Sequence, residues 1–406
     1  MVKRVVMRPI FSFFLISVLF ASLCQAEESA ATADLKTVLT STNIWQSSTL
    51  AGNWRQVSTN AQGRTMLLLE HAPVFGPVPE QVQAYISGET LGEINITYLE
   101  VGNFFASQES RDLGQKKSQK LFKTEFKNIE SALLKELTDL CGPGQKTTVG
   151  KSQLLRSRVT EFKRGGLVLR LYAEDNQLIS VSILPALAAS KELLSVPEGQ
   201  AGLVQRREEV GNNVVKLPDG DIVIQNIPAV DQGERGYCAI GTLTMLTRYY
   251  GLTVNIDMIA AKAGYKEGDV ANANLSGAYA ACAKEAKLKM KVDKVFDFRK
   301  IKIFIQRGEP IIVSRKLERA RDQFHTQFAQ QHESDPTARL PKPDRNERAH
   351  WPASSAGGHV SVINGYNEAR GEVIFSESWG EAARNRRMLA EEMEATAVEV
   401  YYFSPQ

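Results

Sequence analysis

The chain has 406 residues, of which 43% are apolar and 23% are charged, and its formal net charge is +3. This length allows two domains, and the apolar fraction is sufficient for a sizeable core. Lys3, Arg4 and Arg8 supply three positive charges before Ala26, with no acidic residue among them, so the rest of the chain is nearly neutral. A nearly neutral chain excludes the basic footprint of a nucleic-acid-binding protein.

Residues 1–26 have the pattern of a secretory signal peptide, which does not contribute to the fold. A basic start precedes the apolar run PIFSFFLISVLFASL, and small residues end at Ala26. We expect an exported protein, periplasmic or secreted, without membrane attachment once the signal is removed. A retained anchor is disfavoured because the apolar run is shorter than the ~20 residues of a spanning helix. Lipoprotein cleavage before Cys24 is disfavoured by Leu23.

Three cysteines remain after signal removal: Cys141, Cys238 and Cys282. An odd number leaves at least one thiol unpaired within an exported chain. Because oxidising compartments oxidise idle thiols, a free cysteine modestly favours a working thiol, although buried free cysteines are also common. We predict that Cys141 and Cys282 are buried structural residues, with a disulfide between them as the minor alternative.

Residues 34–195 are predicted to form an N-terminal α+β accessory domain. The stretches TMLLLEH, QAYISG, EINITYLEV, LLRSRVTEF, GLVLRLYA and LISVSIL are typical of strands. Between the third and fourth lies a long helix whose apolar stripe repeats every three or four residues: Phe122, Phe126, Ile129, Leu133, Leu137 and Leu140. We expect this helix to pack on an antiparallel sheet. This stretch has no cluster of histidine, cysteine and carboxylate with catalytic or ligand spacing, which favours an accessory or binding role. The alternative is a propeptide that covers the cleft and must be cut away.

Residues 196–215 are polar and are predicted to be a linker, exposed and open to proteolysis at Arg206 and Arg207. The second domain then occupies residues 216–406, with helices after Cys238 and a hairpin near the end.

A charged insertion at residues 316–358 is expected outside the core of the second domain. It carries His325, His332 and His350, which we predict to lie on a solvated surface. The seven-residue spacing of the first two would allow a metal site, but no cysteine or tight acidic set accompanies them. We therefore expect no metal and no cofactor.

The stretch DQGERGYCAIGTLTMLTRYYG places Cys238 where turn residues give way to an apolar helix. A thiol attacks a carbonyl carbon only as thiolate, and a helix N-terminus with a nearby imidazolium favours that form. His359 follows two glycines at the start of a strand, and the partner strand of its hairpin brings Glu377 and Trp379 toward it. Glu377 would orient the imidazole. Gln232 would join the backbone N–H of Cys238 in stabilising an oxyanion.

These segments resemble papain-like cysteine peptidases. QGERGYC is similar to the stretch that joins their oxyanion glutamine to the nucleophile, and GHVSVINGY with FSESWG is similar to their histidine and NSWG strands. CAIGTLTMLTRYYG and RGEPIIVSR look closer to the bacteriocin-leader (double-glycine) peptidase branch. The resemblance covers roughly residues 227–402 and implies a papain-like fold, with Gln232, Cys238 and His359 as oxyanion donor, nucleophile and base.

Two residues depart from the family pattern. Glu377 stands where the family usually has asparagine or aspartate, and Arg235 replaces a cysteine that papain proper uses in a disulfide. The predicted function is a thiol peptidase that hydrolyses peptide or amide bonds of a peptide or protein substrate through a Cys-His-Glu triad. Acyl transfer to an amine, and a non-catalytic binding module on the same fold, remain the alternatives.

Overall fold

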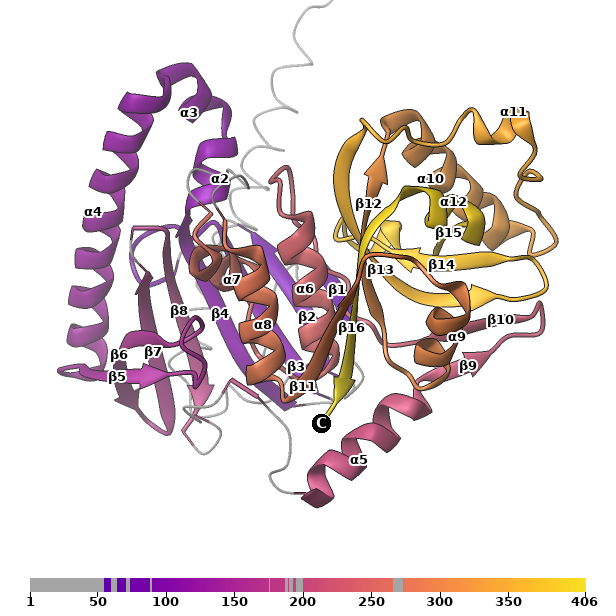
Figure 1. Ribbon diagram of the computed structural model, residues 1–406. Coiled ribbons are helices and arrows are strands. Elements are labelled where there is room, and N and C mark those ends of the chain that lie inside the picture. The colour runs from indigo at the N-terminus through magenta and orange to yellow at the C-terminus, as the bar shows by residue number, and fades with distance from the viewer. Residues whose placement is uncertain are drawn as a thin grey trace, which may run out of the picture.

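The computed structural model describes residues 55–59, 64–70, 74–87, 90–174, 176–186, 189, 193–194, 200–265 and 273–406. The predicted signal peptide lies outside these residues. The structure confirms the α+β class, with a helix-on-sheet part followed by a second part of helices and antiparallel sheet (Figure 1). Among the described helices, none combines the length and apolar character needed to cross a membrane.

The N-terminal part contains an antiparallel sheet of eight described strands in the order β1-β2-β3-β4-β8-β7-β6-β5. Its strands are β1 (Arg55–Thr59), β2 (Arg64–Glu70), β3 (Gln81–Ser87), β4 (Thr90–Glu100), β5 (Gln145–Val149), β6 (Ser157–Arg164), β7 (Leu167–Glu174) and β8 (Leu178–Pro185). The helices α2 (Val101–Ala106), α3 (Gln108–Leu113) and α4 (Gln115–Cys141) connect β4 to β5. All six strands predicted here therefore exist, and the structure adds β1 and β5.

Helix α4 packs against β6, β7 and β8, as predicted (Figure 1). Its predicted stripe lies in the interface: Phe122, Phe126, Leu133 and Leu137 are buried, and Ile129 and Leu140 are partly buried against the same core. Gly142 ends the helix with a φ of +82°, a conformation that glycine adopts without steric cost.

The opposite face of the N-terminal sheet packs against the second domain. Successive strand residues point to opposite faces. In β6 and β7, Phe162 and Leu171 contact the core under α4, whereas Val159 and Tyr172 join the core of the second domain. One hydrophobic core thus runs across both parts of the chain.

The second domain is built on a sheet in the order β11-β16-β12-β13-β10-β9, with β14 paired to β13 and β15 paired to β14. Its strands are β9 (Val214–Lys216), β10 (Asp221–Ile224), β11 (Leu288–Asp293), β12 (Ile311–Leu317), β13 (Gly357–Asn367), β14 (Glu372–Ser376), β15 (Arg386–Leu389) and β16 (Ala397–Pro405). The predicted hairpin is β13 and β14, joined through residues 368–371.

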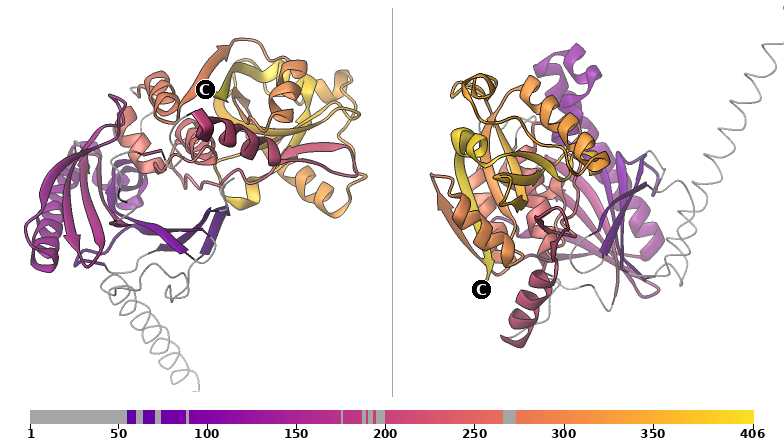
Figure 2. Two further views of the ribbon diagram at one scale, coloured as in Figure 1. Left: turned by 90° about the horizontal axis from the view of Figure 1, so that it is seen from below. Right: turned by 90° about the vertical axis from the view of Figure 1, so that its right-hand side faces the viewer.

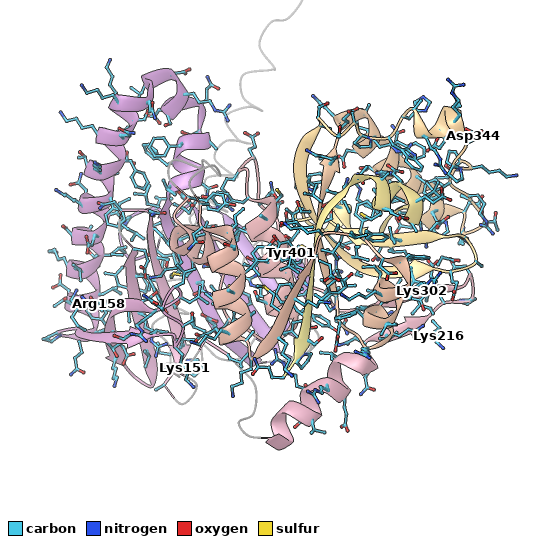
Figure 3. The ribbon with its side chains drawn as sticks, viewed as in Figure 1. Lys151, Arg158, Lys216, Lys302, Asp344 and Tyr401 are labelled. Carbon is cyan, nitrogen blue, oxygen red and sulfur yellow. The ribbon has the colours of Figure 1, made fainter. Side chains whose placement is uncertain are left out.

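The helices of this domain are α6 (Cys238–Tyr249), α7 (Ile256–Ala263), α8 (Leu275–Glu285), α9 (Phe298–Gln306), α10 (Arg319–Ser334), α11 (Arg345–Arg348) and α12 (Ala390–Thr396). Tyr401 of β16 lies between the helices and the sheet, with its ring 4.8 Å from that of Tyr279 on α8 (Figure 3). Gly251 has a φ of +86° just after α6, which confirms its predicted role in ending that helix.

The polar stretch predicted as an exposed linker contains a helix, α5 (Gln200–Asn212), which lies beside the C-terminus (Figure 2). The predicted exposure of Arg206 is wrong. Its side chain is 1% exposed, and it donates hydrogen bonds to the carbonyl oxygens of Ala286 (2.6 Å) and Tyr250 (2.9 Å). The guanidinium is buried because it binds backbone carbonyls of the second domain. Of the two arginines, Arg207 is the exposed one.

Candidate active site

Helix α6 is a fully buried helix whose first residue is Cys238. Every residue from Ala239 to Tyr249 is buried, because the helix is surrounded by the sheet and by α7 and α8. Its buried threonine hydroxyls donate to carbonyl oxygens one turn earlier, as Thr242 does to Cys238 at 2.9 Å. Such bonds satisfy polar groups inside an apolar core. Cys238 is half-buried at the open end of this helix, where backbone N–H groups lack partners within the helix.

His359 and Glu377 are brought together by the β13–β14 hairpin, as predicted. The Nε2 atom of His359 lies 2.7 Å from Oε2 of Glu377, and the two side chains are 5% and 0% exposed. The ring of Trp379 stacks on that of His359, with centroids 4.7 Å apart and an angle of 29° between the planes. Trp379 therefore shields the His359–Glu377 contact from water.

The charges of this pair reinforce each other. Burial and the charge of Arg315 act to lower the pKa of His359, but the charge of Glu377, the interaction with the Cys238 side chain and the hydrogen bond to Glu377 outweigh them and raise it to about 9. Burial alone would raise the pKa of Glu377, but the charges of His359, Arg315 and Arg386 and the His359 hydrogen bond lower it to about 2. At neutral pH the site therefore favours an imidazolium beside a carboxylate.

Cys238 also acts on the imidazole. Its side chain interacts with His359 and contributes to the raised pKa of the histidine. Since Nε2 faces Glu377, Nδ1 is the nitrogen left for the thiol. The site therefore contains a thiol, an imidazole and a carboxylate, which are the three groups that activation of a sulfur nucleophile requires.

Glu377 is held by three residues that sequence reasoning did not identify. Arg315 on β12 donates to Oε1 of Glu377 at 2.8 Å, and Ser361 on β13 donates to the same oxygen at 2.9 Å. Arg386 on β15 lies 3.6 Å from it. These contacts satisfy the longer glutamate side chain and fix its second oxygen toward His359. The sequence did contain one signal for this contact: Arg315 ends the apolar strand sequence RGEPIIVSR, where a charge needs a buried partner.

Gln232 lies in the loop before α6, and hydrogen bonds fix its amide group. Its Oε1 accepts from the Ser378 hydroxyl at 2.6 Å, and its Nε2 donates to the Arg235 carbonyl at 2.6 Å. Its backbone N–H donates to the Ser378 carbonyl at 2.9 Å. One amide hydrogen is engaged by Arg235, which leaves the second for an oxyanion.

A hollow of about 830 Å³ lies beside this loop, between the two parts of the chain. Asp231 and Gly233, which flank Gln232, form one wall. Apolar side chains of the N-terminal helices, including Phe104, Leu121 and Ile129, form the other. Ligand sites commonly lie in such spaces between domains.

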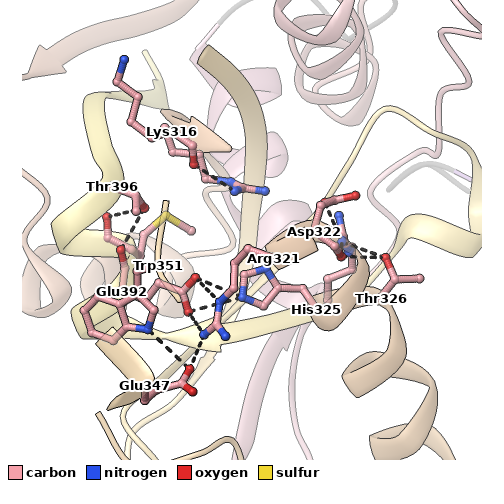
Figure 4. A network of polar contacts seen from close by, with 12 residues as sticks. Lys316, Arg321, Asp322, His325, Thr326, Glu347, Trp351, Glu392 and Thr396 are labelled. Atoms are coloured by element: carbon pink, nitrogen blue, oxygen red, sulfur yellow. Dashed lines mark hydrogen bonds and ion pairs between the residues drawn. The ribbon is translucent and has the colours of Figure 1, made fainter. Parts of the chain in front are cut away.

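The expected solvated surface at His325 and His332 is wrong. His325 is 0% exposed and His332 is 8% exposed. Figure 4 shows the cause for His325: Glu392 of α12 reaches α10, where it accepts from Arg321 at 2.8 Å and lies 3.2 Å from the imidazole. Their mutual compensation allows these charges to be buried. His350 is exposed, as predicted.

Three possible metal ligands, Asp219, Asp221 and His332, lie within 4.8 Å of one another. Arginines already engage both carboxylates. Arg387 donates to Asp221 and lies 4.0 Å from Asp219, and Arg370 lies 3.9 Å from Asp219. This positive charge disfavours a cation at the same position.

The other two cysteines lie outside the site. Cys141 and Cys282 are free thiols, so a disulfide between them is wrong. Cys282 is fully buried, as predicted, and burial raises its pKa. Cys141 was also predicted to be buried, but at the end of α4 it is only half-buried.

Comparisons with known proteins agree with the resemblance seen in the sequence. Residues 224–402 match the model of the Peptidase_C39 like family. The match confirms a relation of this part of the chain to papain-like cysteine peptidases and supports a peptidase. Among curated proteins no match was found.

Two solved structures are similar to this chain, at low sequence identity and low TM-score. A C39-like peptidase from Bacillus anthracis is 13% identical, with a TM-score of 0.30 over 45% of this chain and 96% of that one. Xylellain, a cysteine protease from Xylella fastidiosa, is 13% identical, with a TM-score of 0.28 over 53% of this chain and 92% of that one. At these scores neither likeness bears on function.

Proposed function

We propose that the chain is an exported thiol peptidase in which Cys238, His359 and Glu377 act as nucleophile, base and orienting carboxylate. The observation that carries this proposal is the contact of His359 with Glu377, in which Nε2 lies 2.7 Å from the carboxylate, together with the effect of the Cys238 side chain on the pKa of the same histidine. A buried glutamate that keeps its charge stabilises the imidazolium that accompanies a thiolate.

The reaction starts when Sγ of Cys238 attacks the carbonyl carbon of the scissile amide. The carbonyl oxygen becomes an oxyanion, which the free amide hydrogen of Gln232 and the backbone N–H of Cys238 stabilise. His359 gives its proton to the leaving nitrogen, the C–N bond breaks, and a thioester remains. Water then attacks the thioester while His359 takes one of its protons. The C–S bond breaks, and the carboxylic acid leaves.

The substrate in this proposal is a peptide or protein segment. The walls of the hollow beside residues 231–235 combine apolar side chains with the carboxyl groups of Glu80, Glu109 and Glu125, and neither Cys238 nor His359 lines it. Export is proposed from residues 1–26 alone, and N-terminal sequencing of the mature protein would test the cut after Ala26.

The activity is tested with a peptide library and a labelled peptidyl probe that reacts with activated thiols. We expect hydrolysis by the mature chain and labelling of Cys238. Labelling without turnover, followed by product formation only after an amine acceptor is added, would favour acyl transfer instead. Absence of both labelling and turnover would favour a binding module.

A further inference from the structure

Arg235 connects the N-terminal domain to the loop that carries Gln232. Its Nη1 atom lies 3.0 Å from Oε2 of Glu100, at the end of β4, and 2.7 Å from Oδ1 of Asp257 on α7. The arginine side chain is 5% exposed, and both carboxylates are fully buried. Two carboxyl groups, one from each domain, thus hold one guanidinium.

Arg235 and Gln232 each donate one hydrogen bond to the other. The Nε atom of Arg235 donates to the Gln232 carbonyl at 2.8 Å, and the Arg235 carbonyl accepts from Nε2 of Gln232 at 2.6 Å. Any movement of the Arg235 side chain is therefore transmitted to the amide group beside the expected oxyanion.

Tyr237, the residue before Cys238, makes a second contact with the N-terminal domain. Its hydroxyl donates to Oε1 of Glu100 at 2.7 Å, and its side chain is fully buried. Gly102 allows this approach, because a Cβ there would lie 2.3 Å from the Tyr237 hydroxyl. Both oxygens of Glu100 therefore contact residues that directly precede the nucleophile, and Oε2 also accepts from the backbone N–H of Asn103 at 2.9 Å.

The N-terminal domain also fixes Asp257, the second partner of Arg235. Thr97 on β4 donates to Oδ2 of this carboxylate at 3.1 Å, and Gln81 on β3 donates to the same oxygen at 2.8 Å. Asp257 belongs to the second domain, but its orientation depends on the first.

The contact between the domains resembles the interior of one domain. Residues of β6, β7 and β8, such as Val159, Tyr172 and Leu178, belong to the same buried cluster as Met258 and Ile259 of α7. Interfaces between mobile domains are more polar than this. A segment that must leave for activation would expose this apolar surface and strand the charges of Arg235 and Asp257.

We propose that the N-terminal domain is a permanent part of the active site, and that Glu100 is a positioning residue that holds the oxyanion loop through Arg235 and Tyr237. This inference rests on the proposed peptidase function. It assigns the domain an activating role, in contrast to a propeptide that blocks the cleft.

The test uses the full mature chain and the isosteric variant Glu100→Gln. We expect kcat to fall at least tenfold with KM changed less than threefold, because a displaced oxyanion donor affects the transition state more than substrate binding. Amide hydrogen exchange of residues 231–238 should become faster. Tyr237→Phe, which removes one contact without a charge, should give a smaller loss in the same direction.

Glu174→Gln is the matched control. Glu174 on β7 pairs with Lys262 of α7 at 2.5 Å across the same interface but does not contact the 231–238 loop. If Glu100→Gln and Glu174→Gln lower kcat equally and leave loop exchange unchanged, the positioning role is overturned. Hydrogen exchange needs no activity, so it decides the role of Glu100 even if the wild-type chain neither labels nor hydrolyses, which would instead reject the peptidase.

Discussion

The His359 imidazole and the Glu377 carboxylate form a hydrogen-bonded ion pair in which each partner depends on the other. Nε2 and Oε2 are 2.7 Å apart in a nearly dry environment covered by Trp379. Arg315 occupies the other carboxylate oxygen, so Glu377 cannot turn away from the histidine without losing a second buried charge contact. The extra methylene of glutamate is accommodated by this second anchor.

Replacing Glu377 should separate orientation from charge. Glu377→Gln keeps an oxygen that can accept from His359 and should retain partial activity, whereas Glu377→Ala should lose more. The alanine variant should also lose about 3–5 kcal/mol of stability, because Arg315 is left buried without its carboxylate. Kinetics and denaturant unfolding measure the two effects.

Glu392→Gln is the control for this series. Glu392 is also fully buried and pairs with Arg321 and His325. It is far from Cys238 in sequence and lies on a different helix. It should lower stability and leave kcat unchanged. Wild-type rates in both Glu377 variants would mean that Glu377 does not orient the histidine.

Cys238→Ala should abolish hydrolysis and probe labelling while the protein stays folded, because alanine suits the start of a helix. Cys141→Ala and Cys282→Ala should keep activity if they remain folded. Cys282 is inaccessible to the probe because it is fully buried. Mass spectrometry of the labelled peptide identifies the modified thiol, and residual labelling of Cys238→Ala would contradict the assignment.

Local patterns predicted the elements that carry the candidate site. The turn-to-helix change at Cys238 and the hairpin around residues 368–371 depend on residues that are neighbours in sequence, so both could be predicted from the sequence. Glu100 was not, because it lies 135 residues before Arg235 and its strand pattern is unremarkable in sequence. Long-range ion pairs leave no periodic signal.

The buried histidines of α10 illustrate the same limit. The charged composition of residues 316–358 predicts a solvated surface, but Glu392 lies 67 residues after His325 and supplies the charge that permits burial. Composition reports how many charges a segment has, and partners elsewhere in the chain decide which of them are buried.

The pH dependence should show the raised pKa of His359. The ordinary value of 6.5 becomes about 9, so kcat/KM should fall on the alkaline side as the imidazolium loses its proton near pH 9. Glu377→Gln removes the attraction that raises this pKa, so its alkaline limb should lie at lower pH. An unchanged limb in this variant would show that another group controls it.

Stability should follow the same linkage. Because the folded pKa of His359 is raised, its contribution is fully present below about pH 6.5 and is lost as the pH rises through about 9. The lowered pKa of Glu377 adds stability that is present above about pH 4.5 and is lost as the pH falls through about 2. Wild type should therefore be more stable than Glu377→Gln by a larger margin at pH 5.5 than at pH 10, which lie about one unit below the ordinary and above the folded pKa of His359. Denaturant unfolding at both pH values measures this difference.

Gly241 offers a test of the oxyanion loop that changes no charge. A Cβ at this position of α6 would lie 2.4 Å from Cβ and 2.7 Å from Oγ of Ser378, the hydroxyl that binds Gln232. Gly241→Ala should push Ser378 away, cost about 1–3 kcal/mol by overpacking, and lower kcat by roughly tenfold or more as the amide donor shifts. Gly211→Ala in α5 is the matched control, since a Cβ there meets no atom within 4 Å. It should be neutral or stabilising by up to about 1 kcal/mol from helix propensity, with unchanged kcat. If Gly241→Ala loses stability but keeps full kcat, Ser378 does not position Gln232 for catalysis.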